Sequence, residues 1–161
     1  MKWLPVNAVV ILASIYTVAL FAVELSNHPT RAETRALTHT ISEISAVKIR
    51  LTIDGRSITA TLIDNPTTRD FLSLLPLTIT LEDYAGTEKI AYLPRKLSDE
   101  DAPAGVDPSV GDITYYAPWG NLALFYRDFG YAKGLVKLGS IDEDTEVFNI
   151  PGSVTVTIEP W

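Results

Sequence analysis

Seven aromatic side chains fall within 17 consecutive positions, from 115 to 131, and they are the strongest sign of a binding site in this chain. Aromatic-lined concavities that hold a few polar groups are typical of ligand sites, and Asn121 and Arg127 are the polar groups available here. The candidate ligand-binding residues are Tyr116, Trp119, Asn121, Phe125, Tyr126 and Arg127. The alternative is that these rings only fill core and loop contacts, as most large aromatic side chains do.

The segment 122–126 within this cluster is apolar on both faces. Leu122 and Leu124 fall on one face of the expected strand, and Phe125 falls on the other. A strand of this kind needs a cover on its second face. The sequence leaves open whether a loop, a helix or a ligand provides that cover.

Two acidic triplets, Asp99-Glu100-Asp101 and Asp142-Glu143-Asp144, raise the question of a calcium site, because calcium prefers oxygen ligands. Neither triplet has the spacing of a recognised calcium loop, and neither has a glycine at its bend. Solvated loops that keep the protein soluble explain both triplets more simply. No metal ligands are therefore predicted.

Catalytic sets are hard to assemble from this sequence. Both histidines, His28 and His39, lie before residue 46, whereas a Ser-His-Asp triad needs a histidine beside its nucleophile. The phosphate-binding patterns GxGxxG and GxxxxGKS/T do not occur. Paired carboxylates for glycoside hydrolysis stay open, because no spacing selects two of the 17 acids after residue 45. No catalytic residue and no cofactor is predicted, and whether the protein is an enzyme is left open.

Composition limits the class of protein. Of the 161 residues 47% are hydrophobic and 20% are charged, so the chain can bury a core and one folded domain is expected. A net charge of -7 argues against nucleic-acid binding, which depends on basic side chains. The chain contains no cysteine, which excludes disulfides, thiol nucleophiles and thiolate metal sites.

Residues 3–23 form an uncharged apolar run that is long enough to cross a bilayer as a helix. The run is longer than the apolar part of most secretory signals, which favours a retained membrane anchor over a cleaved signal peptide. A buried helix of the folded domain is the third interpretation. Residues 24–45 are interpreted as a polar tether. We expect the domain at 46–161 to lie outside the cytoplasmic membrane, or to be secreted if the segment is cleaved.

Alternating apolar and polar residues predict β-strands through most of positions 46–161. Val47 to Ile53 and Ile58 to Leu62 alternate strictly, and Asp54-Gly55 between them is a hairpin turn. Further strands are expected at 77–82, 89–93, 113–116, 122–126, 134–139 and 153–159. Seven or eight strands favour closure into a barrel, because closure removes exposed edges.

One helix interrupts these strands. Asn65 followed by Pro66 is a helix start signal, and an apolar stripe at helical spacing runs from Phe71 to Leu75. Pro76 ends the pattern because proline cannot continue the helical hydrogen bonds. We expect this helix to cap one open end of the barrel.

Several of these segments, taken in order, resemble the bacterial cyclophilin-like domain family. They are residues 62–68 (LIDNPTT), 74–77 (LLPL), 92–96 (YLPRK), 111–113 (GDI), 116–123 (YAPWGNLA), 125–128 (FYRD) and 138–141 (LGSI). The resemblance covers about residues 46–159. It implies a mainly β fold, a closed cyclophilin-like β-barrel with one or two short capping helices, here preceded by the N-terminal apolar helix.

True cyclophilins are peptidyl-prolyl isomerases, and a shared fold does not carry their activity across. Their active face has an Arg-Phe pair closely followed by Gln, with a Trp and a His, whereas residues 46–161 contain no Gln, no His and no Arg-Phe step. The leading expectation is non-catalytic binding of a small molecule or an extended peptide segment at the aromatic face. The alternative is a divergent peptidyl-prolyl cis-trans isomerase. A third interpretation is a structural module of a membrane assembly, and no oligomeric state is predicted.

Overall fold

The computed structural model describes residues 46–161. The predicted anchor at 3–23, the tether at 24–45 and both histidines lie outside the described residues, and these expectations stay predictions. Within the described part, no helix combines the length and the apolar character needed to cross a bilayer.

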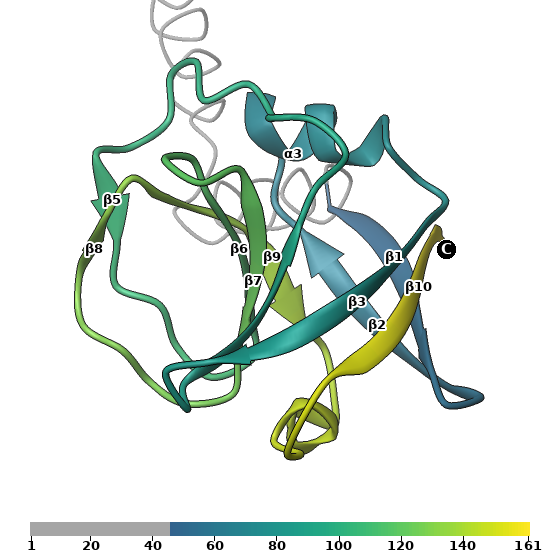
Figure 1. The fold of residues 1–161 in the computed structure, drawn as a ribbon. Coiled ribbons are helices and arrows are strands. Elements are labelled where there is room, and N and C mark those ends of the chain that lie inside the picture. Colours follow the sequence, from purple (N-terminus) through teal and green to yellow (C-terminus); the bar gives the residue numbers. More distant parts are fainter. Residues whose placement is uncertain (1–45) are drawn as a thin grey trace, which may run out of the picture. The chain divides into compact units, whose positions relative to one another are not determined.

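Eight antiparallel strands close into a barrel in the order β1-β10-β3-β4-β7-β6-β9-β2 (Figure 1). The strands are β1 (Val47–Ile53), β2 (Arg56–Leu62), β3 (Leu77–Tyr84), β4 (Glu88–Tyr92), β6 (Asp112–Tyr116), β7 (Asn121–Phe125), β9 (Leu135–Ile141) and β10 (Val154–Pro160). A second, two-stranded sheet pairs β5 (Gly105–Val106) with β8 (Ala132–Lys133). The predicted closed β-barrel is confirmed.

The β1–β2 hairpin forms as its alternation predicts. Leu51 pairs with Ile58 and Ile49 with Ala60, and all four side chains face the barrel interior. Asp54 and Gly55 have φ angles of 48° and 78°, which is the left-handed geometry of a tight hairpin turn.

The barrel interior is filled by the inward set of each strand. The largest fully buried hydrophobic residues from the strands are Ile49, Leu51, Leu62, Leu81, Ile113, Tyr115, Leu122, Leu124, Leu138 and Ile158. Closure between β2 and β9 depends on Gly139, because a Cβ at this position would lie 2.3 Å from the backbone oxygen of Thr61. The missing side chain therefore lets the two backbones approach and complete the barrel.

Helix α3 (Pro66–Leu72) begins where the sequence predicts. The Asn65 side chain accepts a hydrogen bond of 2.7 Å from the Thr68 backbone N–H, and Phe71 packs into the core. The helix ends at Leu72 and not at Leu75, with Ser73 as its C-cap. A 3-10 turn, η2 (Thr145–Phe148), lies toward the opposite end of the barrel in Figure 1 and contributes Phe148 to the core.

Strand β7 is buried on both faces, as its composition predicts. Leu122 and Leu124 face the interior, whereas Ala123 and Phe125 belong to a second, outer cluster with Leu135. The residues packed against this outer cluster are Ile90, Val106, Tyr116 and Ala132. Val106 lies on β5 and Ala132 on β8, so the small sheet covers part of the outer face of the barrel.

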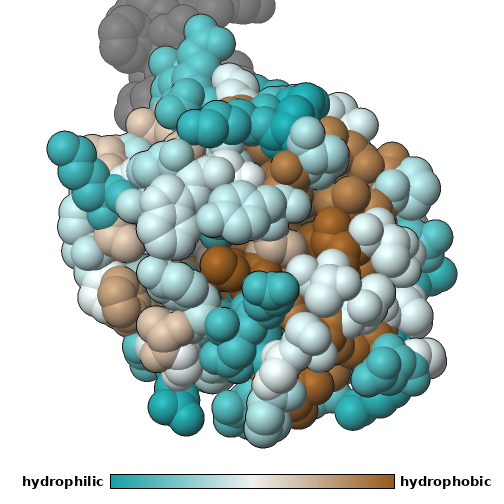
Figure 2. Space-filling view, viewed as in Figure 1, coloured by the Kyte–Doolittle hydropathy of each residue, from teal (hydrophilic) through white to brown (hydrophobic). Residues whose placement is uncertain are grey.

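Strands β3 and β4 diverge along part of their length. Residues 77–81 of β3 pair with β10, and only Glu82, Asp83 and Tyr84 pair with β4. Leu77 and Ile79 are consequently only partly buried against the core. Figure 2 shows hydrophobic surface over the region where Figure 1 draws β3 and β10.

Candidate ligand-binding site

A pocket of about 390 Å³ lies against the outer face of β4 and β7, beside the covering sheet. Its lining residues are Tyr84, Ala85, Thr87, Glu88, Ile90, Tyr116, Trp119, Asn121, Phe125, Phe129, Ala132, Lys133 and Leu135. Four of the six predicted site residues are therefore brought together, namely Tyr116, Trp119, Asn121 and Phe125. A volume of this size suits a small organic ligand.

Strand register fixes the length of the pocket. Asn121 pairs with Tyr92 on one side and with Tyr116 on the other, whereas Glu88 pairs with Phe125. Glu88 and Asn121 are thus four residues apart along paired strands, or about 13 Å at 3.3 Å per residue. They mark two ends of an elongated pocket.

Three aromatic rings form a row along this pocket. The ring centroids of Tyr116 and Trp119 are 5.4 Å apart, and those of Trp119 and Tyr84 are 5.6 Å apart. Both pairs are nearly perpendicular, with interplanar angles of 79° and 87°, which is the favoured edge-to-face arrangement. Trp119 is 46% exposed, so a large part of its indole surface is available to a ligand.

Asn121 is the best candidate for a polar contact. Its side chain is 2% exposed, and Nδ2 donates a 3.2 Å hydrogen bond to the Leu122 backbone oxygen. Oδ1 is buried and has no hydrogen-bond partner among the described residues. A buried acceptor without a partner is unfavourable, so this oxygen is a ready site for a ligand that donates a hydrogen bond.

Glu88 brings a carboxylate to the other end of the pocket. The side chain is partly buried, and this burial raises the pKa of the carboxyl group above its usual range. No lysine or arginine of residues 46–161 forms an ion pair with Glu88. The carboxylate is therefore both desolvated and unpaired within the described part of the chain.

The other two predicted site residues are placed differently. Tyr126 is 8% exposed and packs with the core, where its hydroxyl donates a 2.8 Å hydrogen bond to Asp83 Oδ1. The Arg127 guanidinium lies 6.0 Å from the centre of the Tyr126 ring. Neither residue lines the pocket. Contact of a ligand with any of the six residues stays a prediction.

Sequence reasoning missed Tyr84, Glu88 and Lys133, which also line the pocket. For Glu88 the available signal was the alternation within β4, which places Glu88 and Ile90 on one face and Lys89 and Ala91 on the other but does not tell which face is inward. For Tyr84 at the end of β3 and Lys133 on the short strand β8 no such signal existed, because the sequence does not show that these strands lie beside Trp119.

The acidic triplets do not gather into a metal site within residues 46–161, where no group of three or more metal-ligating side chains occurs. Asp142 instead accepts hydrogen bonds from Thr59, Thr61 and Lys48, at 2.7, 2.6 and 3.3 Å. Burial acts to raise the pKa of Asp142, but these three donors outweigh it and lower the pKa. The carboxylate therefore joins β1 and β2 to the end of β9.

Comparison with known proteins identifies the domain. The model of the cyclophilin-like family matches residues 51–159. The chain belongs to this family. No curated protein matches the chain at a significant level.

The cyclophilin-like domain also has a structural neighbour. The solution structure of a hypothetical protein from Archaeoglobus fulgidus matches it with a TM-score of 0.52 and 15% sequence identity. The match covers 73% of this chain and 96% of that chain. At this level of identity the likeness shows the fold alone.

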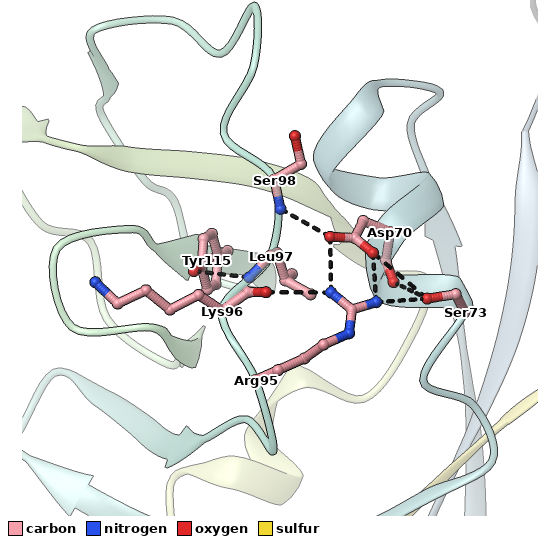
Figure 3. Close-up of polar contacts among 7 residues, drawn as sticks. All are labelled: Asp70, Ser73, Arg95, Lys96, Leu97, Ser98 and Tyr115. Carbon is pink, nitrogen blue, oxygen red and sulfur yellow. Dashed lines mark hydrogen bonds and ion pairs between the residues drawn. The ribbon is translucent and has the colours of Figure 1, made fainter.

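Arg95, from the segment 92–96 (YLPRK), meets Asp70 of α3 in a polar network (Figure 3). Arg95 holds Asp70 with two hydrogen bonds, Nη2 to Oδ1 at 2.5 Å and Nη1 to Oδ2 at 2.9 Å. The Ser98 backbone N–H donates to the same carboxylate at 2.8 Å, and Tyr115 accepts from the Leu97 N–H at 3.0 Å. The Arg95 hydrogen bond is the main cause that lowers the pKa of Asp70 to about 2. These residues position the segment after β4 and do not line the pocket.

None of the five arginines of residues 46–161 lines the pocket. Arg56, Arg69 and Arg95 pair with Asp144, Asp64 and Asp70, and Arg50 and Arg127 lie over the rings of Trp161 and Tyr126. The arginine that the cyclophilin resemblance implies for isomerisation is therefore not supplied to this pocket by the described residues.

Proposed function

We propose that the cyclophilin-like domain is a non-catalytic binding module that takes a small organic molecule, or an extended peptide segment, in the pocket on β4 and β7. The observation that carries this proposal is the unpartnered Oδ1 of Asn121 inside an aromatic-lined pocket. A ligand that donates a hydrogen bond there satisfies a buried acceptor and covers apolar surface in the same step.

Two features of the walls support this proposal. Trp119 and Tyr116 present flat surfaces at defined angles, and the floor at Ile90 and Phe125 is apolar. Burial of apolar ligand surface against such walls supplies the free energy of binding, and the Asn121 amide sets the orientation. No acid–base pair or nucleophile is required.

The test is calorimetric titration of the full-length protein with phenylbutanol, an uncharged probe with an aromatic body and a hydroxyl donor. We expect the wild-type protein to bind it and Trp119→Ala to bind it about tenfold more weakly, because a stacking wall is removed. Trp161→Ala is the matched control, since Trp161 lies over Arg50 and does not line the pocket. Equal affinity of wild type and Trp119→Ala contradicts the proposal.

The isomerase alternative has its own measurement. The full-length protein is assayed for acceleration of cis-trans isomerisation in a short proline peptide. Acceleration that disappears in Trp119→Ala favours the enzyme over the binding module, whereas no acceleration alongside phenylbutanol binding favours the binding module.

A further inference from the structure

Each end of the pocket presents a hydrogen-bond acceptor that has no cationic partner among residues 46–161, and at Glu88 the only side-chain donor is the Thr87 hydroxyl. At one end lies the buried Oδ1 of Asn121, and at the other lies the partly buried carboxylate of Glu88. Neither has an ion-pair or hydrogen-bond donor from a cationic side chain of residues 46–161. A ligand that complements this pocket must therefore bring donors, and at Glu88 it gains most by bringing a positive charge.

An aromatic ring stands beside the carboxylate. Tyr84 and Glu88 are directly paired between β3 and β4, and both line the pocket. Side chains that are directly opposite in an antiparallel pair begin about 5 Å apart. A carboxylate next to an aromatic face is a favourable environment for an ammonium or guanidinium group, which is attracted by both.

The cation that follows Glu88 in the chain faces away from the pocket. Lys89 follows Glu88 in the chain but points into the barrel, where its Nζ donates to Asp83 Oδ2 and to the backbone oxygens of Ile150 and Gly152. Its side chain is completely buried. Lys89 therefore leaves the outward carboxylate of Glu88 for another partner.

The cation that does line the pocket belongs to the opposite end. Lys133 lies two residues before Leu135, which pairs with Tyr116, and Tyr116 pairs with Asn121. Its side chain is exposed, so its charge is hydrated and weak as a ligand contact. Glu88 is therefore the charged residue of the pocket that is partly shielded from water.

We infer that the pocket selects an elongated organic cation, with an amine or guanidine group bound between Glu88 and Tyr84 and an apolar body lying along Trp119 and Tyr116. This inference rests on the proposed function and adds the chemical class of the ligand. Burial raises the pKa of Glu88, because the ionised carboxylate loses hydration, and a bound cation would offset that loss.

The test compares three probes that share one body and differ in the end group: phenylbutylamine, phenylbutanol and phenylbutyrate. Calorimetric titration of the full-length protein is expected to rank the amine first, by about tenfold over the alcohol, with the carboxylate weakest. Glu88→Gln keeps the size of the side chain and removes its charge. In this variant the amine and the alcohol are expected to bind equally.

Glu82→Gln is the matched control, because Glu82 is an exposed acid on the neighbouring strand that does not line the pocket. It removes the same net charge and is expected to keep the preference for the amine. The inference is overturned if wild type does not prefer the amine, if Glu88→Gln keeps the preference, or if Glu82→Gln loses it equally.

The failure of the inference differs from the failure of the proposed function. If phenylbutanol binds and Trp119→Ala lowers its affinity, the proposed function is supported. The comparison of phenylbutylamine with phenylbutanol then decides the cation preference separately. If none of the three probes binds, both the proposed function and the inference are contradicted.

Discussion

Glu88 and Lys89 are consecutive residues of β4 with opposite charges, and their side chains lie on opposite sides of the barrel wall. Lys89 is 0% exposed, with its Nζ 2.8 Å from Asp83 Oδ2 and 2.6 Å from the backbone oxygens of Ile150 and Gly152. Glu88 lines the outer pocket. One strand thus carries a structural cation inward and a free anion outward.

Replacement of the inward cation is expected to destabilise the domain strongly. Lys89→Met removes three hydrogen bonds that a fully buried ammonium makes to partly buried oxygen atoms, so we expect a loss of about 3 kcal/mol in the free energy of unfolding. Urea denaturation measures this loss. Lys133→Met, at an exposed position, is the control and should cost under about 0.5 kcal/mol. Equal stability of the two variants would show that the Lys89 ammonium does not stabilise the segment between η2 and β10, which carries Ile150 and Gly152.

The ion pair beside α3 predicts a pH dependence of stability. The pKa of Asp70 is about 2 in the folded protein against an ordinary value of 3.8. Because the folded pKa is depressed, the stabilisation is complete above pH 3.8 and is lost as the pH falls toward 2. Asp70→Asn is expected to lower the melting temperature at pH 7 by roughly 5 °C or more, with a gap that closes at low pH.

Melting curves of Asp70→Asn and wild type between pH 2 and pH 7 check this expectation. Asp64→Asn is the matched control, because Asp64 pairs with Arg69 at a more exposed position. Its melting temperature should stay close to that of wild type at every pH. If the difference in melting temperature between Asp70→Asn and wild type does not change with pH, the low pKa of Asp70 in the folded protein is contradicted.

Asn121 is expected to separate stability from binding. Asn121→Leu removes a buried Oδ1 that has no partner, together with the Nδ2 hydrogen bond to the Leu122 oxygen, and puts an apolar side chain of similar size in its place. Because these two changes oppose each other, the melting temperature should change little. The variant should also lose the preference for phenylbutanol over butylbenzene, which lacks the hydroxyl donor. Thermal melts and calorimetry measure the two effects. Asn149→Leu is the control, because Asn149 caps the end of η2 and does not line the pocket. It should keep the preference for phenylbutanol over butylbenzene.

Barrel closure predicts a large effect at one glycine. Gly139→Ala places a Cβ 2.3 Å from the Thr61 backbone oxygen, so β2 and β9 must separate, at a cost of about 2 kcal/mol. Gly130→Ala is the control, because a Cβ there meets no atom within 4 Å. Urea denaturation of both variants is the measurement, and equal midpoints would contradict the close approach.

Local patterns were enough to predict much of this fold. The alternation from Val47 to Leu62 around Asp54-Gly55 determined a hairpin, and Asn65-Pro66 determined the start of α3, because both signals act between residues close in the chain. Apolar residues on both faces of 122–126 predicted a covered strand, which the structure confirms. The predicted end of the helix at Leu75 was wrong, because Leu74 and Leu75 form turn-type hydrogen bonds to Phe71 and Leu72 and still pack against the core.

The sequence by itself therefore determined a closed barrel with an aromatic segment on a doubly buried strand. Only the tertiary structure decided which side chains share the pocket. It joined Tyr84 and Glu88 to Trp119 and turned Tyr126 inward to Asp83. The physical reason is that periodicity assigns a residue to a strand face, whereas the neighbours on that face come from strand pairing, here the pairing of β4 with the distant β7.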